Sequence, residues 1–333
     1  MRSPVVLLQN IPTTLKAPFS SHPLVLEAIR KAHFRLQRAI CGMYPGSLVL
    51  SINAEVIYHR LVRKITELNG VPAEPLVPRK LGPKMCVPFG KILRGNAVPN
   101  TVTKTLHTDK VFAQDLRSHT IAPYPGYAPL DSQLRTVRSF RRPVILVDDM
   151  LHSGTRLSVL DPMFRREGLE IDQVIVGFLS GRGRDMMAGW GRKVDCVYSV
   201  PNLRAWFVES TIYPFIGGDT LGGAAGSVPG LTPGVNLILP YALPRFYKDR
   251  SRRAVFQFSK TCLENSRNIL LALENAYREQ YARNLTLSRL SEAIILPLAP
   301  DKGDTLRYDP NLSASACLEN DLKMLLRMRE LLD

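Results

Sequence analysis

The segment VILVDDMLHSGT, residues 144–155, decides the fold of this chain. Its four apolar residues, Val144–Val147, are typical of a strand buried on both faces, and the pair Asp148-Asp149 follows directly. A loop of small and polar residues comes next, and a helix is predicted over 155–167. Ligands bind beyond the carboxyl ends of strands in an open parallel sheet, so we expect a ligand site here.

The residue types of this loop favour a sugar phosphate as the ligand. Backbone N–H groups at the loop and helix start, with the hydroxyls of Ser153 and Thr155, can hold a phosphate. Asp148 and Asp149 can accept hydrogen bonds from vicinal ribose hydroxyls, and Gly154 lets the backbone approach a ligand closely. The alternative interpretation is an ordinary capped helix after a buried strand.

Strands and helices alternate on both sides of this segment, as judged from the spacing of apolar residues. Alternation of this kind predicts an α/β fold with a parallel sheet covered by helices. The predicted elements are helices over 25–40, 56–68 and 184–190, and strands over 47–52, 101–107, 174–179 and 194–200.

The composition changes near residue 216, where glycine and proline become frequent, and helical spacing returns after residue 250. We therefore expect four parts. They are an N-terminal segment (1–20), a core (21–215), a Gly/Pro-rich linker or hood loop (216–250) and a helical C-terminal region (251–333).

The charge and cysteine content limit the class of protein. The 44 Lys and Arg residues exceed the 29 Asp and Glu residues by 15, and such a charge attracts polyanions. No apolar run approaches the roughly 18 residues of a membrane-spanning helix. The five cysteines form no CxxC pair. We expect a cytoplasmic protein with reduced thiols and no membrane contact, and RNA binding stays open.

Residues 144–155 resemble the phosphoribosyl diphosphate (PRPP) motif of type I phosphoribosyltransferases. The shared pattern is four apolar strand residues, two acids, two apolar residues and a Ser-Gly-Thr loop, with the spacing nearest to orotate phosphoribosyltransferase. The resemblance implies a type I phosphoribosyltransferase-like parallel sheet flanked by helices, with a C-terminal helical appendage or hood. It also implies that Asp148 and Asp149 bind the ribose hydroxyls. The residues implied to wrap the 5-phosphate are Met150, Leu151, His152, Ser153, Gly154 and Thr155.

His152 stands where enzymes acting on hypoxanthine or guanine carry an Asp general base, which argues against a 6-oxopurine substrate. Its imidazole is a candidate catalytic base, because histidine titrates near neutral pH, or a donor to phosphate. The resemblance also implies Mg²⁺ as cofactor. Asp149 and Asp219 are the candidate metal ligands, and an ordinary Gly-Gly-Asp turn is the alternative for Asp219.

Other expected parts of the site follow the order in which the family has them. Ser51, Ile52, Asn53 and Ala54 are similar in place to the pyrophosphate loop, and a strand-to-helix turn capped by Asn53 is the alternative. Lys104 stands where family members place a basic pyrophosphate ligand and is a candidate catalytic residue. A solvated strand lysine is its alternative.

Two further segments match the family only by position. The long connection 108–138 corresponds to the flexible catalytic loop, with Lys110 and Arg117 as candidates to meet pyrophosphate. Trp206 and Phe207, after the last predicted core strand, are candidates to stack on the base. Buried packing is the alternative for both aromatic residues.

The sequence thus predicts an Mg²⁺-dependent phosphoribosyltransferase that transfers the phosphoribosyl group of PRPP to a nucleobase or related nucleophile and releases pyrophosphate. We expect a homodimer in nucleotide metabolism or a specialised pathway. The alternative is a catalytically weak PRPP-binding regulator that binds RNA. A pyrophosphokinase that makes PRPP is disfavoured, since its loop is one residue longer and no second core-like half is seen here.

Overall fold

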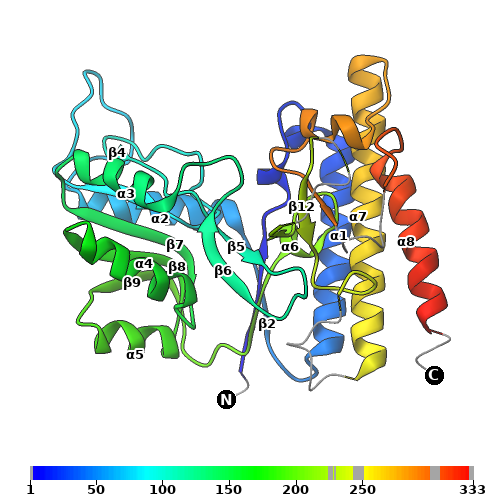
Figure 1. Cartoon of the computed structure of the whole chain (residues 1–333), viewed down its shortest axis with the longest axis horizontal. Coiled ribbons are helices and arrows are strands. Elements are labelled where there is room, and N and C mark those ends of the chain that lie inside the picture. Colours follow the sequence, from blue (N-terminus) through cyan, green and yellow to red (C-terminus); the bar gives the residue numbers. More distant parts are fainter. Residues whose placement is uncertain (1–2, 224–227, 229, 243–250, 301–307, 330–333) are drawn as a thin grey trace. The chain divides into compact units, whose positions relative to one another are not determined.

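The computed structural model describes residues 3–223, 228, 230–242, 251–300 and 308–329, and the chain forms two compact units. Unit 1 takes the residues up to 51, residues 111–120 and the residues from 205 onward. Unit 2 takes 52–110 and 121–204. The chain therefore passes between the units four times. Both units combine helices with strands, which confirms the expected α/β class (Figure 1).

Unit 2 is built on a five-stranded sheet in which every strand pair that the register defines is parallel. The strand predicted at Val144–Val147 lies at its centre, with Ile145 opposite Cys86 on one side and Leu146 opposite Val174 on the other. Parallel pairing brings the carboxyl ends of all five strands to one edge. In sheet order the strands are β4 (Val102–Thr103), β3 (Met85–Pro88), β7 (Val144–Leu151), β8 (Ile171–Ser180) and β9 (Val194–Val200).

Helices cover both faces of this sheet. Helix α2 (Ala54–Leu68) packs against β8 and β9, where Gly177 leaves room for the side chain of Ile57. Val176, the neighbour of Gly177, points to the opposite face because successive strand side chains alternate. There it joins a buried cluster with apolar residues of α3 (Leu130–Ser139), α4 (Thr155–Arg166) and α5 (Gly181–Gly189).

The connection 108–138 differs from the expected open loop. It contains strand β5 (Thr108–Phe112), strand β6 (His119–Pro123) and helix α3. Helix α3 forms because Leu130, Leu134 and Val137 recur on one face and are buried in the cluster of unit 2. The predicted strand 101–107 is correspondingly shorter, since only β4 is extended there.

Unit 1 contains one sheet and most strands of a second, whose strands β5 and β6 each have residues assigned to both units. The first has the order β10-β1-β2, in which β1 (Val5–Gln9) pairs in parallel with β10 (Ala205–Val208). Strand β2 (Val49–Asn53) is its other edge, and the chain passes into unit 2 at its end. The second sheet has the order β13-β12-β11-β5-β6. Its further strands are β11 (Asp219–Leu221), β12 (Thr232–Val235) and β13 (Leu298–Pro300).

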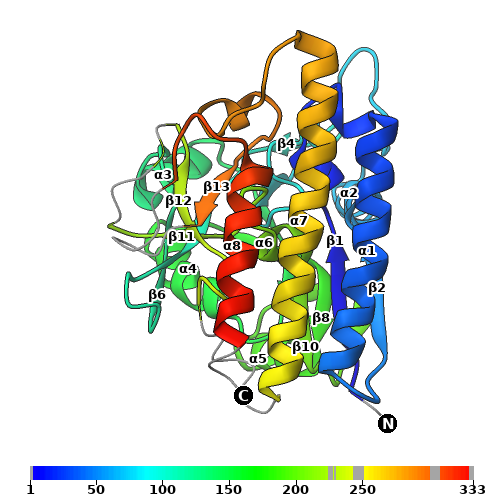
Figure 2. The same ribbon diagram turned by 90° about the vertical axis from the view of Figure 1, so that its right-hand side faces the viewer.

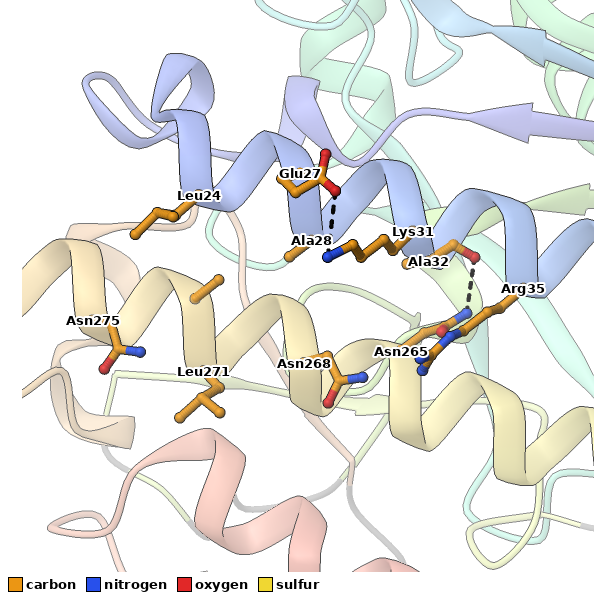
Figure 3. A pocket seen from close by; sticks show the side chains of 11 residues that line it. Leu24, Glu27, Ala28, Lys31, Ala32, Arg35, Asn265, Asn268, Leu271 and Asn275 are labelled. Atoms are coloured by element: carbon orange, nitrogen blue, oxygen red, sulfur yellow. Dashed lines mark hydrogen bonds and ion pairs between the residues drawn. The ribbon is translucent and has the colours of Figure 1, made fainter.

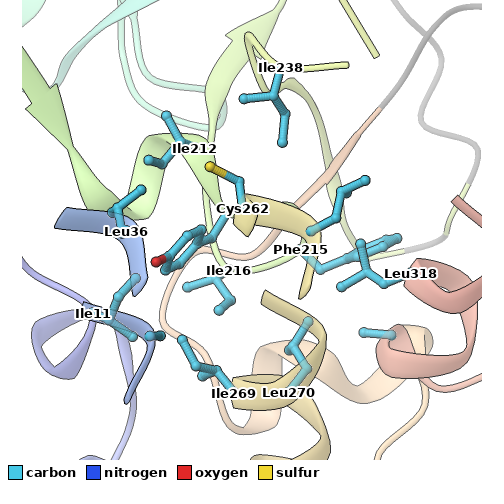
Figure 4. Close-up of a cluster of buried hydrophobic side chains, with 14 of the residues drawn as sticks. Ile11, Leu36, Ile212, Phe215, Ile216, Ile238, Cys262, Ile269, Leu270 and Leu318 are labelled. Carbon is cyan, nitrogen blue, oxygen red and sulfur yellow. The ribbon is translucent and has the colours of Figure 1, made fainter. Parts of the chain in front are cut away.

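Three long helices of unit 1 lie side by side, as Figures 1 and 2 both show. Helix α7 (Arg252–Tyr281) packs against both α1 (Pro23–Met43) and α8 (Ala314–Arg329). The buried cluster between them includes Leu36, Phe215, Cys262, Ile269 and Leu318 (Figure 4). The short helices of this unit are η1 (Pro12–Thr14), η2 (Phe19–Ser21), α6 (Glu209–Ile212) and η4 (Leu287–Glu292).

The two units do not coincide with the expected boundaries at residues 20, 215 and 250. Helix α1 packs against α7, so residues 21–51 belong with the helical C-terminal region and not with the sheet of unit 2. The predicted linker 216–250 supplies β11 and β12 to a sheet, because these segments find strand partners in β5 and β13. Its residues 224–227, 229 and 243–250 lie outside the described residues. Within the described parts of the chain, no helix combines the length and the apolar character needed to cross a membrane.

Candidate functional site

Strand β7 carries the two acidic residues inside its carboxyl-terminal half, because it continues to Leu151. Successive side chains of a strand point to opposite faces, so Asp148 and Asp149 enter different surroundings. Asp148 is buried, and Asp149 is half-buried.

The carboxylate of Asp148 is held by Arg156, which lies in the first turn of α4. Its Oδ1 accepts the Arg156 Nη1–H at 3.0 Å and the backbone N–H of Asp149 at 2.8 Å. The same Nη1 donates to the carbonyl oxygen of Phe89 at 3.0 Å. Burial raises the pKa of Asp148 to about 6, an effect that Arg156 opposes and Asp149 reinforces. The carboxylate is therefore mostly ionised at neutral pH and becomes protonated in mild acid.

Asp149 joins β7 to the loop after β3. Its Oδ2 accepts the backbone N–H of Lys91 at 2.6 Å, and its Oδ1 accepts that of Ile92 at 2.9 Å. A Cβ atom at Gly90 would lie 2.7 Å from Cγ of Asp149, closer than real Cβ contacts. Glycine at position 90 is thus what lets the loop close around this carboxylate.

Ser180, the last residue of β8, holds the loop between β7 and α4. His152 Nδ1 lies 2.9 Å from Oγ of Ser180, which also accepts the backbone N–H of Gly183 at 3.1 Å. Burial, followed by the nearby charge of Arg182, lowers the pKa of His152, so its ring is neutral at pH 7.

The start of α4 has the features of an anion site. Gly154 is the N-cap residue with a φ of +66°, and it has no side chain that could accept a hydrogen bond from the first turn. The first N–H groups of a helix have no partner inside the helix and attract anions. The hydroxyls of Ser153 and Thr155, 2.9 Å apart, stand beside them. A phosphate group matches this arrangement.

Positively charged residues follow strands β3 and β4, which lie on the side of β7 away from β8. Arg94, after β3, donates to the carbonyl oxygen of Thr108 at 3.0 Å and lies 5.3 Å from the ring centre of Tyr124. Lys104, after β4, is exposed. Burial and then the charges of Arg94 and Lys104 lower the pKa of His107. These cations, with the acidic pair and the open helix start, suit a ligand that carries both hydroxyls and phosphates.

The predicted pyrophosphate loop, Ser51–Ala54, does not follow a strand that pairs with β7. Strand β2 lies in the sheet of unit 1, and the side chain of Asn53 accepts the backbone N–H of Glu55 at 2.8 Å as the cap of α2. The strand that pairs with β7 is β3, so the loop 89–92 occupies the neighbouring position. This loop was missed because its strand is only four residues long and lies in a stretch rich in proline and glycine.

Three other predicted residues belong to unit 1. Phe207 is buried, with ring centres 6.0 Å from Tyr44 and 5.7 Å from Phe258, and so it packs in the core of that unit. Trp206 lies opposite Val6 in the β1–β10 pair. Asp219 begins β11.

Lys110 and Arg117, the two predicted cations of the lid, lie on β5 and between β5 and β6. Their backbone N–H groups bond to the carboxylates of Asp109 and Asp115, each from a position close in sequence.

The acidic pair does not form a metal site by itself. Asp148 and Asp149 both accept N–H donors, and among the described residues no three His, Cys, Asp or Glu side chains gather as metal ligands. Mg²⁺ bound only by protein groups therefore does not fit the residues present.

No protein-family model matches the chain. No curated protein matches it either. Among solved structures it is similar to a purine phosphoribosyltransferase from Pyrococcus horikoshii Ot3, with 12% sequence identity and a TM-score of 0.24. That match covers 46% of this chain and 84% of the other. The roles of residues in unit 2 therefore rest on the geometry of unit 2 itself.

Proposed function

We propose that unit 2 binds PRPP at the carboxyl edge of its sheet and that the protein transfers the phosphoribosyl group to an acceptor base or related nucleophile. One observation carries the proposal. Adjacent carboxylates at the end of the central parallel strand β7 are followed at once by a Ser-Gly-Thr loop and by the start of α4, which Gly154 leaves without a side-chain cap.

Each part of the ligand has a group of matching chemistry. The carboxylate oxygens of Asp148 and Asp149 accept hydrogen bonds from ribose hydroxyls. The first N–H groups of α4 and the hydroxyls of Ser153 and Thr155 hold the 5-phosphate. The diphosphate lies toward the cations that follow β3 and β4, among which Lys104 is exposed.

In the transfer, the bond from ribose C1 to the diphosphate oxygen breaks and a bond from C1 to the acceptor forms. The chain contributes by positioning the reactants and by surrounding the departing diphosphate with positive charge. A neutral His152 accepts the acceptor's proton or donates to phosphate. Mg²⁺ commonly binds through one or two carboxylates together with substrate phosphates, so it stays a prediction that depends on the ligand.

The test is a calorimetric titration of PRPP with Mg²⁺ into the wild type, Asp149→Asn and Asp172→Asn. The control residue, Asp172, lies at the amino-terminal end of β8, where it pairs with Lys84 at 2.7 Å. We expect binding that Asp149→Asn weakens at least tenfold and that Asp172→Asn leaves unchanged. Equal affinities in all three proteins, or no binding to the wild type, would contradict the proposed site.

Pyrophosphate release is then measured over a panel of bases. Release with one base identifies the acceptor. Binding of PRPP without release for any base would replace the transferase by a PRPP-binding regulator.

A further inference from the structure

A groove of about 400 Å³ runs between α1 and α7 in unit 1 (Figure 3). Its size is within the range of ligand sites. Lys31 and Arg35 contribute cations from α1, and Asn268 contributes an amide from α7. Figure 3 shows Lys31 and Arg35 on α1 and Asn268 on α7.

The exposed side of α1 is strongly basic. Helix α1 has four cations and one acid, Glu27. Arg30 and Lys31 pair with Glu27 at 2.8 and 3.3 Å. Arg35 and Arg38 form no ion pair or side-chain hydrogen bond with any residue that the structure describes. These two charges are available to an anionic partner.

An aromatic side chain stands among these cations. Phe34 is 70% exposed, the largest exposure of an aromatic residue in the described chain. It lies four positions from both Arg30 and Arg38 and three from Lys31, so all four share one side of the helix. Lys31 also lines the groove, whereas Phe34 and Arg38 belong to the exposed face of α1 beside it. A ring this exposed adds little to the core, and its face is open to a planar partner.

A buried asparagine of α7, Asn265, lies between the two helices at the groove. Asn265 is 1% exposed, and its Nδ2 donates to the carbonyl oxygen of Ala32 and to Oη of Tyr213, each at 3.0 Å. Its Oδ1 is buried and accepts no hydrogen bond from the described residues. Asn265 therefore holds α1 and α7 together beneath the groove, and its amide is not open to a ligand.

We propose that the groove, together with the exposed face of α1 beside it, binds single-stranded nucleic acid. Proteins that bind single strands combine a basic groove along the phosphates with aromatic side chains on which bases stack. Arg35 in the groove and Arg38 on the adjoining face of α1 supply the phosphate contacts, and Phe34 on that face supplies the stacking surface. The amide of Asn268, which lines the groove, supplies a polar contact to a base edge. This site lies in unit 1 and does not depend on the function proposed for unit 2.

Two other occupants fit less well. An amphipathic partner helix needs a continuous apolar groove, whereas this one is interrupted by Asn265, Asn268 and Asn275. A second copy of the chain would bring two basic α1 faces together, and like charges repel.

The test is fluorescence anisotropy of a labelled 12-nucleotide oligouridylate, with the deoxy oligonucleotide in parallel, from 50 to 300 mM salt. Phe34→Ala removes the stacking ring, and its matched control is Leu326→Ala, which removes an exposed apolar side chain of α8. Arg35→Ala/Arg38→Ala removes two charges, and its control is Lys323→Ala/Arg327→Ala on α8. All of these side chains are exposed, and circular dichroism checks that the variants fold.

We expect Phe34→Ala to weaken binding about tenfold. The double arginine variant should reduce the slope of log affinity against log salt by about 1.4, which is two single-strand phosphate contacts. Both α8 controls should bind like the wild type. No binding at 50 mM salt, equal losses in the controls, or full competition by an oligoglutamate of equal charge would overturn the proposal.

Discussion

The carboxylate of Asp149 accepts the backbone N–H of Lys91 at 2.6 Å, a bond that ties the end of β7 to the loop after β3. Two adjacent strands therefore share one anchor at the edge where the ligand is proposed to bind. The carboxylate also accepts the N–H of Ile92. A substitution on either side of this contact should therefore disturb both the loop after β3 and the loop after β7.

Gly90→Ala tests this anchor. The added methyl group would overlap the Asp149 carboxylate and its backbone, so we expect a loss of about 1–3 kcal/mol in the free energy of unfolding. PRPP binding should weaken in parallel. The control is Gly189→Ala in α5, where a Cβ meets nothing within 4 Å and stability should stay equal or rise slightly. Urea unfolding of the two variants gives the comparison, and a Gly90→Ala protein as stable as Gly189→Ala would contradict the packing described.

Asp148→Asn tests the buried carboxylate through the pH dependence of stability. The pKa of Asp148 is raised from 3.8 to about 6 in the folded chain, so folding favours its protonated form. Its contribution to stability is present below about pH 4 and is lost as the pH rises toward 6. Between pH 4 and 7 the wild type should lose up to about 3 kcal/mol relative to Asp148→Asn. The measurement is urea unfolding at several pH values. Parallel curves for the two proteins would show that the folded-state pKa of Asp148 is not raised.

Ser180→Ala tests the support of His152. The variant loses the N-cap of α5 and the hydroxyl beside Nδ1 of His152. We expect a loss of about 1 kcal/mol in stability from the cap, together with a shifted His152 titration in NMR and weaker PRPP binding. Ser251→Ala removes the N-cap of α7, where the hydroxyl accepts the backbone N–H of Ala254 and pairs with no histidine among the described residues. It should lower stability by a similar amount while the His152 titration stays in place. If His152 titrates identically in the two variants, Ser180 does not support His152 in the site.

Leu36→Ala tests the packing of α1 against α7. Leu36 is fully buried in the cluster of unit 1, so truncation should cost about 2–5 kcal/mol. Leu26→Ala, on the exposed side of the same helix, should change stability by less than about 1 kcal/mol. Thermal and urea unfolding measure both. A small effect at Leu36 would mean that α1 does not pack on α7 as described.

Much of the fold was predictable because periodic patterns survive in long elements. Helices α1 and α2 and strands β8 and β9 lie where apolar spacing predicts them, with shifts of a few residues at their ends. Strands β10 to β13 were not predicted because each has three or four residues, too few for alternation to show. Their extended form depends on partners from distant parts of the chain.

The candidate site, too, could be predicted from the sequence only in part. Residues 148–155 could be proposed from sequence because they are contiguous and combine acids, hydroxyls and glycine in a short span. Arg156 and Ser180 could not, since their roles come from contacts to Asp148 and His152 that only the folded sheet creates. The expected pyrophosphate loop followed the first predicted strand in sequence, whereas the neighbour of β7 is set by strand order in the sheet.

The pairing of β1 with β10 has a consequence for synthesis of the chain. Strand β1 leaves the ribosome about 200 residues before its partner Ala205–Val208. At about 5–20 residues per second, this apolar strand waits on the order of 10–40 s for its parallel neighbour. During that time Val5–Leu8, which are wholly buried in the folded chain, are exposed to other nascent chains. A chaperone that binds Val5–Leu8 would cover this apolar strand until β10 is made.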